Sequence, residues 1–158
     1  MEMADVESLL GIFSDPEAMR YYPGIKDREE TVAWVRSNQE RYRKYGFGLW
    51  TVTLKESREF AGQCGPTVQN VEDQEEIEIG YLFLRKFWGR GLATEAARAC
   101  RDYCFEYLGH TRLVSLIDPK NLASRRVAEK VGMTLEKRIE KWNKTICVYS
   151  LDGHCASR

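Results

Sequence analysis

The sequence predicts an α+β fold in which a mixed, mostly antiparallel β-sheet is flanked by helices. The chain has 158 residues, 43% of them hydrophobic and 30% charged, which suits one compact core, so we expect a single domain over residues 1–158. Its middle is rich in aromatic and β-branched residues with polar turns between them, which indicates strands. A strand, a helix and a strand then follow across residues 76–117, and such a crossover makes its two strands parallel.

The N-terminal third is expected to be helical. Residues 6–13 and 16–21 indicate a first helix that is interrupted. Asp27, with Glu30 three residues later, predicts the start of a second helix, whose apolar spacing continues to Gly46. No strand is expected before these helices.

Three strands are expected next, over residues 47–54, 60–68 and 76–84, as an antiparallel meander. The helix that follows has an apolar stripe on one face, and Gly109 stands where a left-handed residue would end it. The stripe consists of Ala96, Cys100, Tyr103, Cys104 and Tyr107.

The last part of the chain predicts a short strand, a helix and a hairpin. The strand covers residues 112–117, and the helix covers residues 122–131 and ends at Gly132. Two strands over residues 135–142 and 145–151 form the hairpin, with its turn at Asn143 and Lys144.

Charge and targeting signals exclude several classes of partner. Lysine plus arginine and aspartate plus glutamate each number 24, so no overall field attracts nucleic acid. The sequence has neither a signal-peptide layout nor an apolar run long enough to span a bilayer. We expect a cytoplasmic protein with no nucleic-acid or membrane partner.

The cysteines are expected to be reduced, and no metal site is expected. They form no CxxC pair, are odd in number, and are accompanied by two histidines, His110 and His154. Cys100 and Cys104 are expected to be buried on one helix face. The cysteines are Cys64, Cys100, Cys104, Cys147 and Cys155.

The run Trp-Gly-Arg-Gly-Leu-Ala-Thr at residues 88–94 predicts an anion-binding turn between a strand and a helix. Two glycines and a small alanine let several backbone N–H groups point into one hollow, where the helix dipole also favours negative charge. Arg90 adds positive charge. A tight turn without a ligand remains the alternative. The run GxxxxGK[ST] of a P-loop is absent, and the dinucleotide fingerprint GxGxxG would need glycine at Thr94.

Three blocks, at residues 78–81, 87–96 and 121–133, occur in an order and spacing with which the sequence resembles the GNAT acetyltransferases, and within them the RimJ/RimL-like branch. The resemblance covers about residues 4–151. It implies a GNAT-like sheet whose β-α-β crossover carries a pyrophosphate loop, and acetyl-CoA as cofactor. The residues that it implies for cofactor binding are Leu82, Phe83, Leu84, Trp88, Gly89, Arg90, Gly91, Leu92, Ala93, Thr94, Asn121 and Ser124.

The sequence departs from this pattern in three places. Trp88 replaces the glutamine or arginine that opens the loop in the superfamily, as is usual in this branch. Ala128 stands where many relatives have a tyrosine that assists the leaving thiolate. The first β-strand of the branch is missing, which exposes a sheet edge and leaves the oligomeric state open, a homodimer included.

Acetyl transfer to an amine requires a base for the ammonium proton and donors for the developing oxyanion. Glu78, on the strand that flanks the thioester in this family, is the candidate base, acting through water. The alternative is a solvated glutamate beside Glu75 and Glu76, although crowding of these carboxylates would raise the pKa of one of them. The backbone N–H groups of residues 82–84 are the candidate oxyanion donors.

Ser124 is the candidate donor to the leaving thiolate, with water as an alternative. Ser124 also fits a helix-first-turn serine that satisfies a backbone amide, and Asn121 fits the N-cap of the same helix or a contact to the pantetheine amide.

The acceptor groove is expected to combine Glu78 with an aromatic wall of Tyr21, Tyr22, Trp50 and Trp142. Aromatic faces favour cationic amines, although core packing is the alternative for these residues. The leading hypothesis is an acetyl-CoA-dependent N-acetyltransferase acting on a peptide N-terminus or a small-molecule amine. The rival, based on Ala128 and the missing strand, is a CoA-binding sensor or interaction module without catalysis.

Overall fold

The computed structural model describes residues 1–153, so His154 and Cys155 lie outside the described residues. Within them a six-stranded sheet has the order β1-β2-β3-β4-β6-β5. The helices are η1 (Met3–Asp5), α1 (Val6–Phe13), α2 (Arg28–Tyr45), η2 (Arg85–Phe87), α3 (Leu92–Glu106) and α4 (Leu122–Val131). The strands are β1 (Trp50–Thr53), β2 (Phe60–Val71), β3 (Gln74–Phe83), β4 (Arg112–Ile117), β5 (Thr134–Lys141) and β6 (Lys144–Asp152). This confirms the predicted α+β fold with a mixed sheet.

The described chain divides into two compact units. The first contains residues 1–65 and 80–93, and the second contains residues 66–79 and the chain from Thr94 onward. Strands β2 and β3 each begin in one unit and end in the other. No strand precedes α1 within residues 1–153. The assignment of residues 1–158 to one domain stays a prediction.

The predicted second helix of the first unit is confirmed at both ends. The Asp27 carboxylate accepts the Glu30 N–H at 2.9 Å, and the Glu30 carboxylate accepts the Asp27 N–H at 2.8 Å, which satisfies two amides that the helix leaves unpaired. Gly46 ends α2 with φ of 78°, a left-handed conformation that glycine adopts without strain.

The predicted helical segment at residues 16–21 is wrong. These residues form turns, closed by isolated bonds such as Met19 N–H to the Asp15 carbonyl at 3.0 Å. Pro16 lies three residues after the end of α1 and has no N–H to donate, so α1 does not continue through it. The segment contributes buried Ala18 and Met19 to the core that α1 and α2 form.

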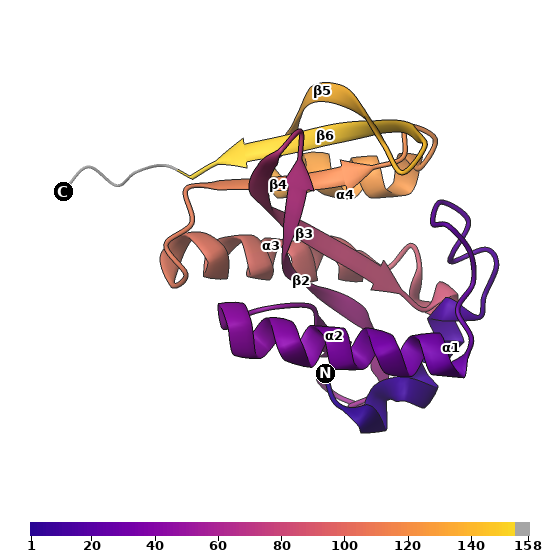
Figure 1. Ribbon diagram of the computed structural model, residues 1–158. Coiled ribbons are helices and arrows are strands. Elements are labelled where there is room, and N and C mark those ends of the chain that lie inside the picture. The colour runs from indigo at the N-terminus through magenta and orange to yellow at the C-terminus, as the bar shows by residue number, and fades with distance from the viewer. Residues whose placement is uncertain (154–158) are drawn as a thin grey trace. The chain divides into compact units, whose positions relative to one another are not determined.

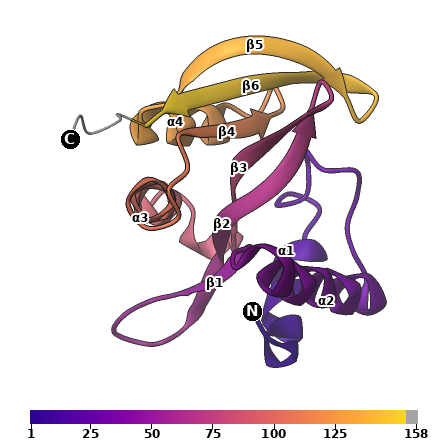
Figure 2. The ribbon, with the colours of Figure 1, turned by 60° about the vertical axis from the view of Figure 1, so that its left-hand side comes forward.

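α1 and α2 pack together and enclose the core of the first unit (Figures 1 and 2). The Phe13 and Trp34 rings meet edge to face, with centroids 5.5 Å apart. The Trp34 indole N–H donates to the Gln63 side chain of β2 at 3.0 Å, so this partly buried polar group is satisfied. The buried members of the core are Val6, Leu9, Ile12, Phe13, Ala18, Met19 and Val35.

The predicted crossover from β3 through α3 to β4 is present, and its residues 80–93 belong to the first unit. β3 pairs with β4 in parallel, with Glu78 opposite Val114, whereas β4 with β6 and β5 with β6 are antiparallel. β4 and α4 have the predicted bounds, and α4 packs beside β4 (Figure 2). Gly132 is the left-handed C-cap of α4 with φ of 103°, as predicted. Gly109 also has a positive φ, of 71°, but α3 already ends at Glu106, so Gly109 lies in the loop after the helix.

The hairpin turn between β5 and β6 lies one residue earlier than predicted. Trp142 and Asn143 have φ of 54° and 58°, and Lys141 pairs with Lys144. A two-residue turn with both central residues at positive φ matches the twist of the strands, which places Lys144 in the ladder instead of in the turn.

The predicted apolar stripe of α3 is correct in part. Cys100 and Cys104 are buried, together with Ala97, and burial raises the pKa of the Cys104 thiol to about 12. Tyr103 and Tyr107 are exposed, the latter at 75%, and their rings stack on each other with centroids 5.4 Å apart. Their spacing predicted the buried side of the helix, but Tyr103 is on the exposed side of α3 and Tyr107 lies one residue beyond its end.

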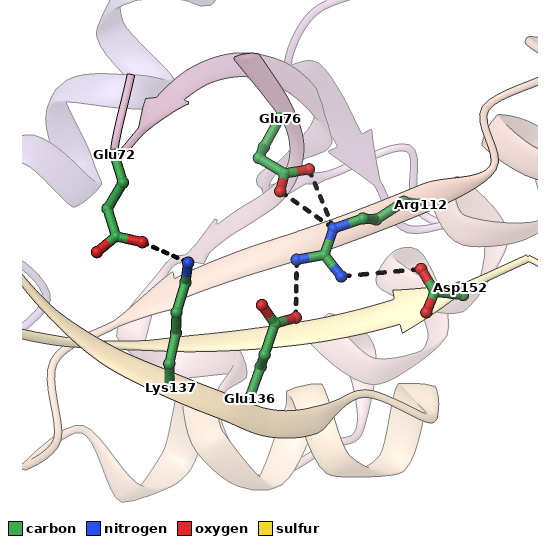
Figure 3. Close-up of polar contacts among 6 residues, drawn as sticks. All are labelled: Glu72, Glu76, Arg112, Glu136, Lys137 and Asp152. Atoms are coloured by element: carbon green, nitrogen blue, oxygen red, sulfur yellow. Dashed lines mark hydrogen bonds and ion pairs between the residues drawn. The ribbon is translucent and has the colours of Figure 1, made fainter. Parts of the chain in front are cut away.

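An arginine connects four strands of the second unit (Figure 3). Arg112 of β4 contacts Glu76 of β3 at 3.0 Å, Glu136 of β5 at 2.7 Å and Asp152 of β6 at 3.8 Å. The pKa of the Glu136 carboxyl lies below its usual value because the Ser150 hydroxyl and the Arg112 guanidinium bond to it.

Candidate active site

The turn at residues 88–91 has the backbone conformation that its glycines permit. Gly89 and Gly91 have φ of 75° and 77°, and a Cβ placed on either would meet no atom within 4 Å. Space is therefore not the reason for glycine at these positions. Glycine is required there because the backbone is left-handed, a conformation that costs other residues steric energy.

Three basic residues occur in and just before this turn, and they differ in their partners. Arg85 pairs with Asp15 at 3.1 Å, and Lys86 pairs with Glu59. Arg90 has no ion pair within residues 1–153, and its guanidinium lies 5.3 Å from the centre of the Phe87 ring. Arg90 therefore keeps a charge available for an anion at the turn.

Trp88 ties the turn to the end of β3. Its indole N–H donates to the Phe83 carbonyl at 3.0 Å, while 46% of the residue remains exposed. Backbone bonds from Phe87 to Leu84 and from Trp88 to Arg85 tighten the connection. Trp88 thus positions the loop through its side chain.

The turn leads directly into α3, a helix of 15 residues that begins at Leu92. The first amides of a helix lack intrahelical partners, so those of Leu92, Ala93 and Thr94 are available for an anion, and the helix dipole adds to the attraction. Together with the charge of Arg90, this arrangement fits the diphosphate of a nucleotide cofactor.

The expected donors at residues 82–84 are not equivalent. The Leu84 N–H already donates to the Ala61 carbonyl at 2.9 Å, so this amide is engaged in the sheet, which corrects its expected role. Gly62 of β2 lies against the other two, because a Cβ there would stand 2.4 Å from the Leu82 carbonyl oxygen and 2.8 Å from Phe83 Cα.

Glu78 is a half-buried, hydrogen-bonded carboxylate, which corrects the alternative of a solvated one. Its Oε1 accepts the Leu116 N–H of β4 at 3.2 Å. The expected crowding with Glu76 is relieved, because the Glu76 carboxylate is held by Arg112. The structure thus gives the two carboxylates on this face of β3 different partners.

Asn121 is the N-cap of α4, as predicted. Its side-chain oxygen accepts the Ser124 N–H at 3.2 Å, which caps the first turn of the helix. Arg125 fixes the start of the helix by donating to the Pro119 carbonyl at 3.1 Å and to the Tyr149 hydroxyl at 2.9 Å. Ala128 is 1% exposed.

The four expected aromatic residues lie in different elements. Tyr21 and Tyr22 are in the turns after α1, Trp50 begins β1, and Trp142 is in the β5–β6 turn. Tyr22 and Trp142 are exposed, and the Lys141 ammonium lies 4.9 Å from the centre of the Trp142 ring. The convergence of these side chains on one acceptor groove stays a prediction.

Ser115 is a buried polar residue of β4 that was not predicted from the sequence. This residue is 2% exposed and its hydroxyl donates to the Ile79 carbonyl at 2.9 Å. A lone hydroxyl in the otherwise apolar run Leu-Val-Ser-Leu-Ile was the signal that could have identified it.

The described residues contain neither a metal-binding cluster nor a membrane-spanning helix. No cluster of three or more histidine, cysteine, aspartate or glutamate side chains is arranged to hold a metal ion in that part of the chain. No helix among residues 1–153 has the length and apolarity to cross a membrane.

Comparison with known proteins identifies relatives along most of the chain. Residues 1–134 match the acetyltransferase (GNAT) domain family. Over 150 residues, the chain is 50% identical to the YkkB protein of Bacillus subtilis, and the match covers 94% of this chain and 87% of that protein.

Solved structures have the same fold. An acetyltransferase from Agrobacterium tumefaciens superposes with a TM-score of 0.84 at 29% identity, over 97% of this chain and 88% of that one. RimL, a ribosomal L7/L12 α-N-protein acetyltransferase in complex with coenzyme A, superposes with a TM-score of 0.80 at 18% identity, over 96% of this chain and 90% of RimL.

Proposed function

The chain belongs to the GNAT acetyltransferase family, and on that premise we propose that it acetylates a peptide N-terminus or a small-molecule primary amine by direct attack in a ternary complex. Its general activity follows from the family: the chain is an acyltransferase that takes the acetyl group from acetyl-CoA and passes it to an amine. The observation that carries the proposal is the turn at Gly89 and Gly91, with unpaired Arg90, at the start of α3.

We assign the cofactor's diphosphate to the backbone amides of residues 89–94 and to Arg90. When bound, acetyl-CoA supplies an acetyl group activated as a thioester. Trp88 holds the loop in place through the Phe83 carbonyl, and Asn121 orients the start of α4. The N–H groups of Leu82 and Phe83 are the proposed donors to the acyl oxygen.

Glu78 is the proposed base, removing the ammonium proton through a water molecule. Its bond to the Leu116 N–H fixes the position of the carboxylate, and a carboxylate accepts several hydrogen bonds at once. Ser124 or water supplies the hydrogen bond to the departing thiolate. A thiolate of ordinary pKa, near 8.5, is already a fair leaving group, so this contribution is modest.

The RimJ/RimL-like branch is the proposed place of the chain in the family. The fold shared with RimL, which acts on a ribosomal protein N-terminus, supports a peptide acceptor. Tyr21, Tyr22, Trp50 and Trp142 are the proposed acceptor contacts. A cytoplasmic location fits this role and is part of the proposal.

The test is an acceptor array of N-terminal peptides, polyamines, aminoglycosides and metabolite amines that measures free CoA, followed by mass spectrometry of the product. We expect CoA release with one amine class, and release about 10²–10⁴-fold slower with Glu78→Gln at neutral pH and the same enzyme concentration. Purified protein that binds no acetyl-CoA and releases no CoA with any amine would contradict the proposal.

One observation favours a second function, a CoA-binding module without catalysis. Ala128 is buried in α4 at the position where many relatives carry a tyrosine hydroxyl. Such a module would bind acetyl-CoA tightly and leave the thioester intact with every acceptor, which the same array detects.

A further inference from the structure

The parallel pairing of β3 with β4 is interrupted by side-chain hydrogen bonds directly after the pair of Glu78 and Val114. A ladder that continued would next join the Leu116 N–H to the Ile79 carbonyl. Instead, the Leu116 N–H donates to Glu78 Oε1 at 3.2 Å, and the Ile79 carbonyl accepts from Ser115 Oγ at 2.9 Å. A side chain of each strand is therefore hydrogen-bonded to a backbone group of the other strand, in place of a backbone–backbone bond.

The burial of Ile79 and Ser115 explains why the Ile79 carbonyl needs a hydrogen-bond donor. Ile79 is 1% exposed, Ser115 2% exposed, and the adjacent Val114 fully buried. A carbonyl left unbonded in such a place costs about 1–3 kcal/mol, so the hydroxyl satisfies a group that water does not reach. An apolar residue at position 115 would suit the rest of the strand, which indicates that the hydroxyl is there for this bond.

We propose that Ser115 is a positioning residue that, together with Glu78, fixes the rung at which the β3–β4 ladder stops. The β3–β4 ladder ends at the boundary between the two units in the sequence of β3. Ile79 is the last residue of β3 in the second unit, and Gly80 belongs to the first unit. The strand then continues to Leu82, Phe83 and the turn. The inference rests on the proposed function in one respect: this following segment is the one to which we assign acetyl-CoA contacts.

Substitution of the two side chains has distinct consequences. In Ser115→Ala, the Ile79 carbonyl loses its donor and competes with Glu78 for the Leu116 N–H. In a Ser115→Ala/Glu78→Ala double variant, both side-chain bonds are gone and the backbone rung closes. Ser115→Thr keeps the hydroxyl and so keeps the stop.

The rung can be measured directly by nuclear magnetic resonance, as the scalar coupling across a hydrogen bond between the Leu116 amide nitrogen and the Ile79 carbonyl carbon. We expect no coupling in the unmodified chain and in Ser115→Thr, and a coupling in the double variant. Calorimetric titration with CoA gives the second readout, and we expect affinity about tenfold weaker in the double variant, as one rearranged hydrogen bond would produce. Ser150→Ala is the matched control, because that hydroxyl is on β6 and bonds Glu136.

Two results overturn the proposal: a coupling already present in the unmodified chain, or a double variant that folds and shows neither the coupling nor weaker CoA binding. An unmodified chain that does not bind CoA refutes the proposed function, while the coupling still decides where the ladder stops. If the double variant does not fold, Ser115→Ala decides. Weakened CoA binding that Ser115→Thr restores supports the proposal, and equal affinities in all three chains overturn it.

Discussion

Replacing Gly91 separates the two ways in which a glycine can serve an anion-binding turn. Gly91 has φ of 77°, and a Cβ there would meet no atom within 4 Å. In Gly91→Val the added atoms therefore have room, and the penalty comes from the backbone. A non-glycine residue in the left-handed region costs about 1–2 kcal/mol, and a β-branched residue stands at the upper end or beyond. Asparagine tolerates this region much better.

We therefore expect Gly91→Val to weaken CoA binding about 10- to 30-fold, because about 1.4 kcal/mol corresponds to a factor of ten, whereas Gly91→Asn stays within a few-fold. Isothermal titration with CoA measures the affinity, and thermal unfolding checks that both variants are folded. Equal losses in the two variants would mean that side-chain bulk, and not backbone conformation, decides. An unchanged dissociation constant in Gly91→Val would mean that the diphosphate binds elsewhere.

Three further predictions concern other residues. Glu78→Gln should lower turnover by about 10²–10⁴-fold with little change in CoA affinity, because the glutamine amide oxygen still accepts the Leu116 N–H. The loss of turnover should shrink as the pH rises towards the acceptor's own pKa, and near-normal turnover at neutral pH would refute the assignment. The Glu136 pKa is lowered in the folded chain, so its contribution to stability is complete above the ordinary value of 4.5 and disappears as pH falls through the folded pKa. The unfolding free energies of Glu136→Gln and the unmodified chain, from urea titrations, should therefore differ at neutral pH and converge in acid; a constant difference would contradict this. Asn121→Ala should lower the unfolding free energy by about 1 kcal/mol, and Asn121→Asp should restore most of it in the same titration.

The features predicted best from the sequence are those marked by residues with one strong local preference. Asn121 and Gly132 delimit α4, and Asp27, Glu30 and Gly46 delimit α2, because caps and left-handed ends depend on a few neighbouring atoms. The parallel pair was predictable as well, since the connection between β3 and β4 contains a helix.

The features that the sequence did not predict depend on distant contacts. Tyr103 and Tyr107 have the spacing of a buried stripe, but the final rotation of α3 is set by what packs against it. The bond between Leu84 and Ala61 and the partner of Ser115 both join residues more than 20 positions apart, so no local pattern encodes them. In the candidate site, the glycine turn was predictable from the order of residues 88–94 between a strand and a helix. The partners of Glu76 and Glu78 were not, because both lie on β4, which is distant in the sequence.

Trp88 also gives the turn an optical signal of its own. Its indole is bonded to the Phe83 carbonyl and is close to half exposed, whereas Trp34 is held between Phe13 and Gln63. A ligand that binds at the loop changes the solvation of the Trp88 ring. The emission wavelength and the quantum yield of the ring's fluorescence change with it. In a chain that keeps Trp88 as its one tryptophan, rapid mixing would follow cofactor arrival and departure in real time, with no attached dye.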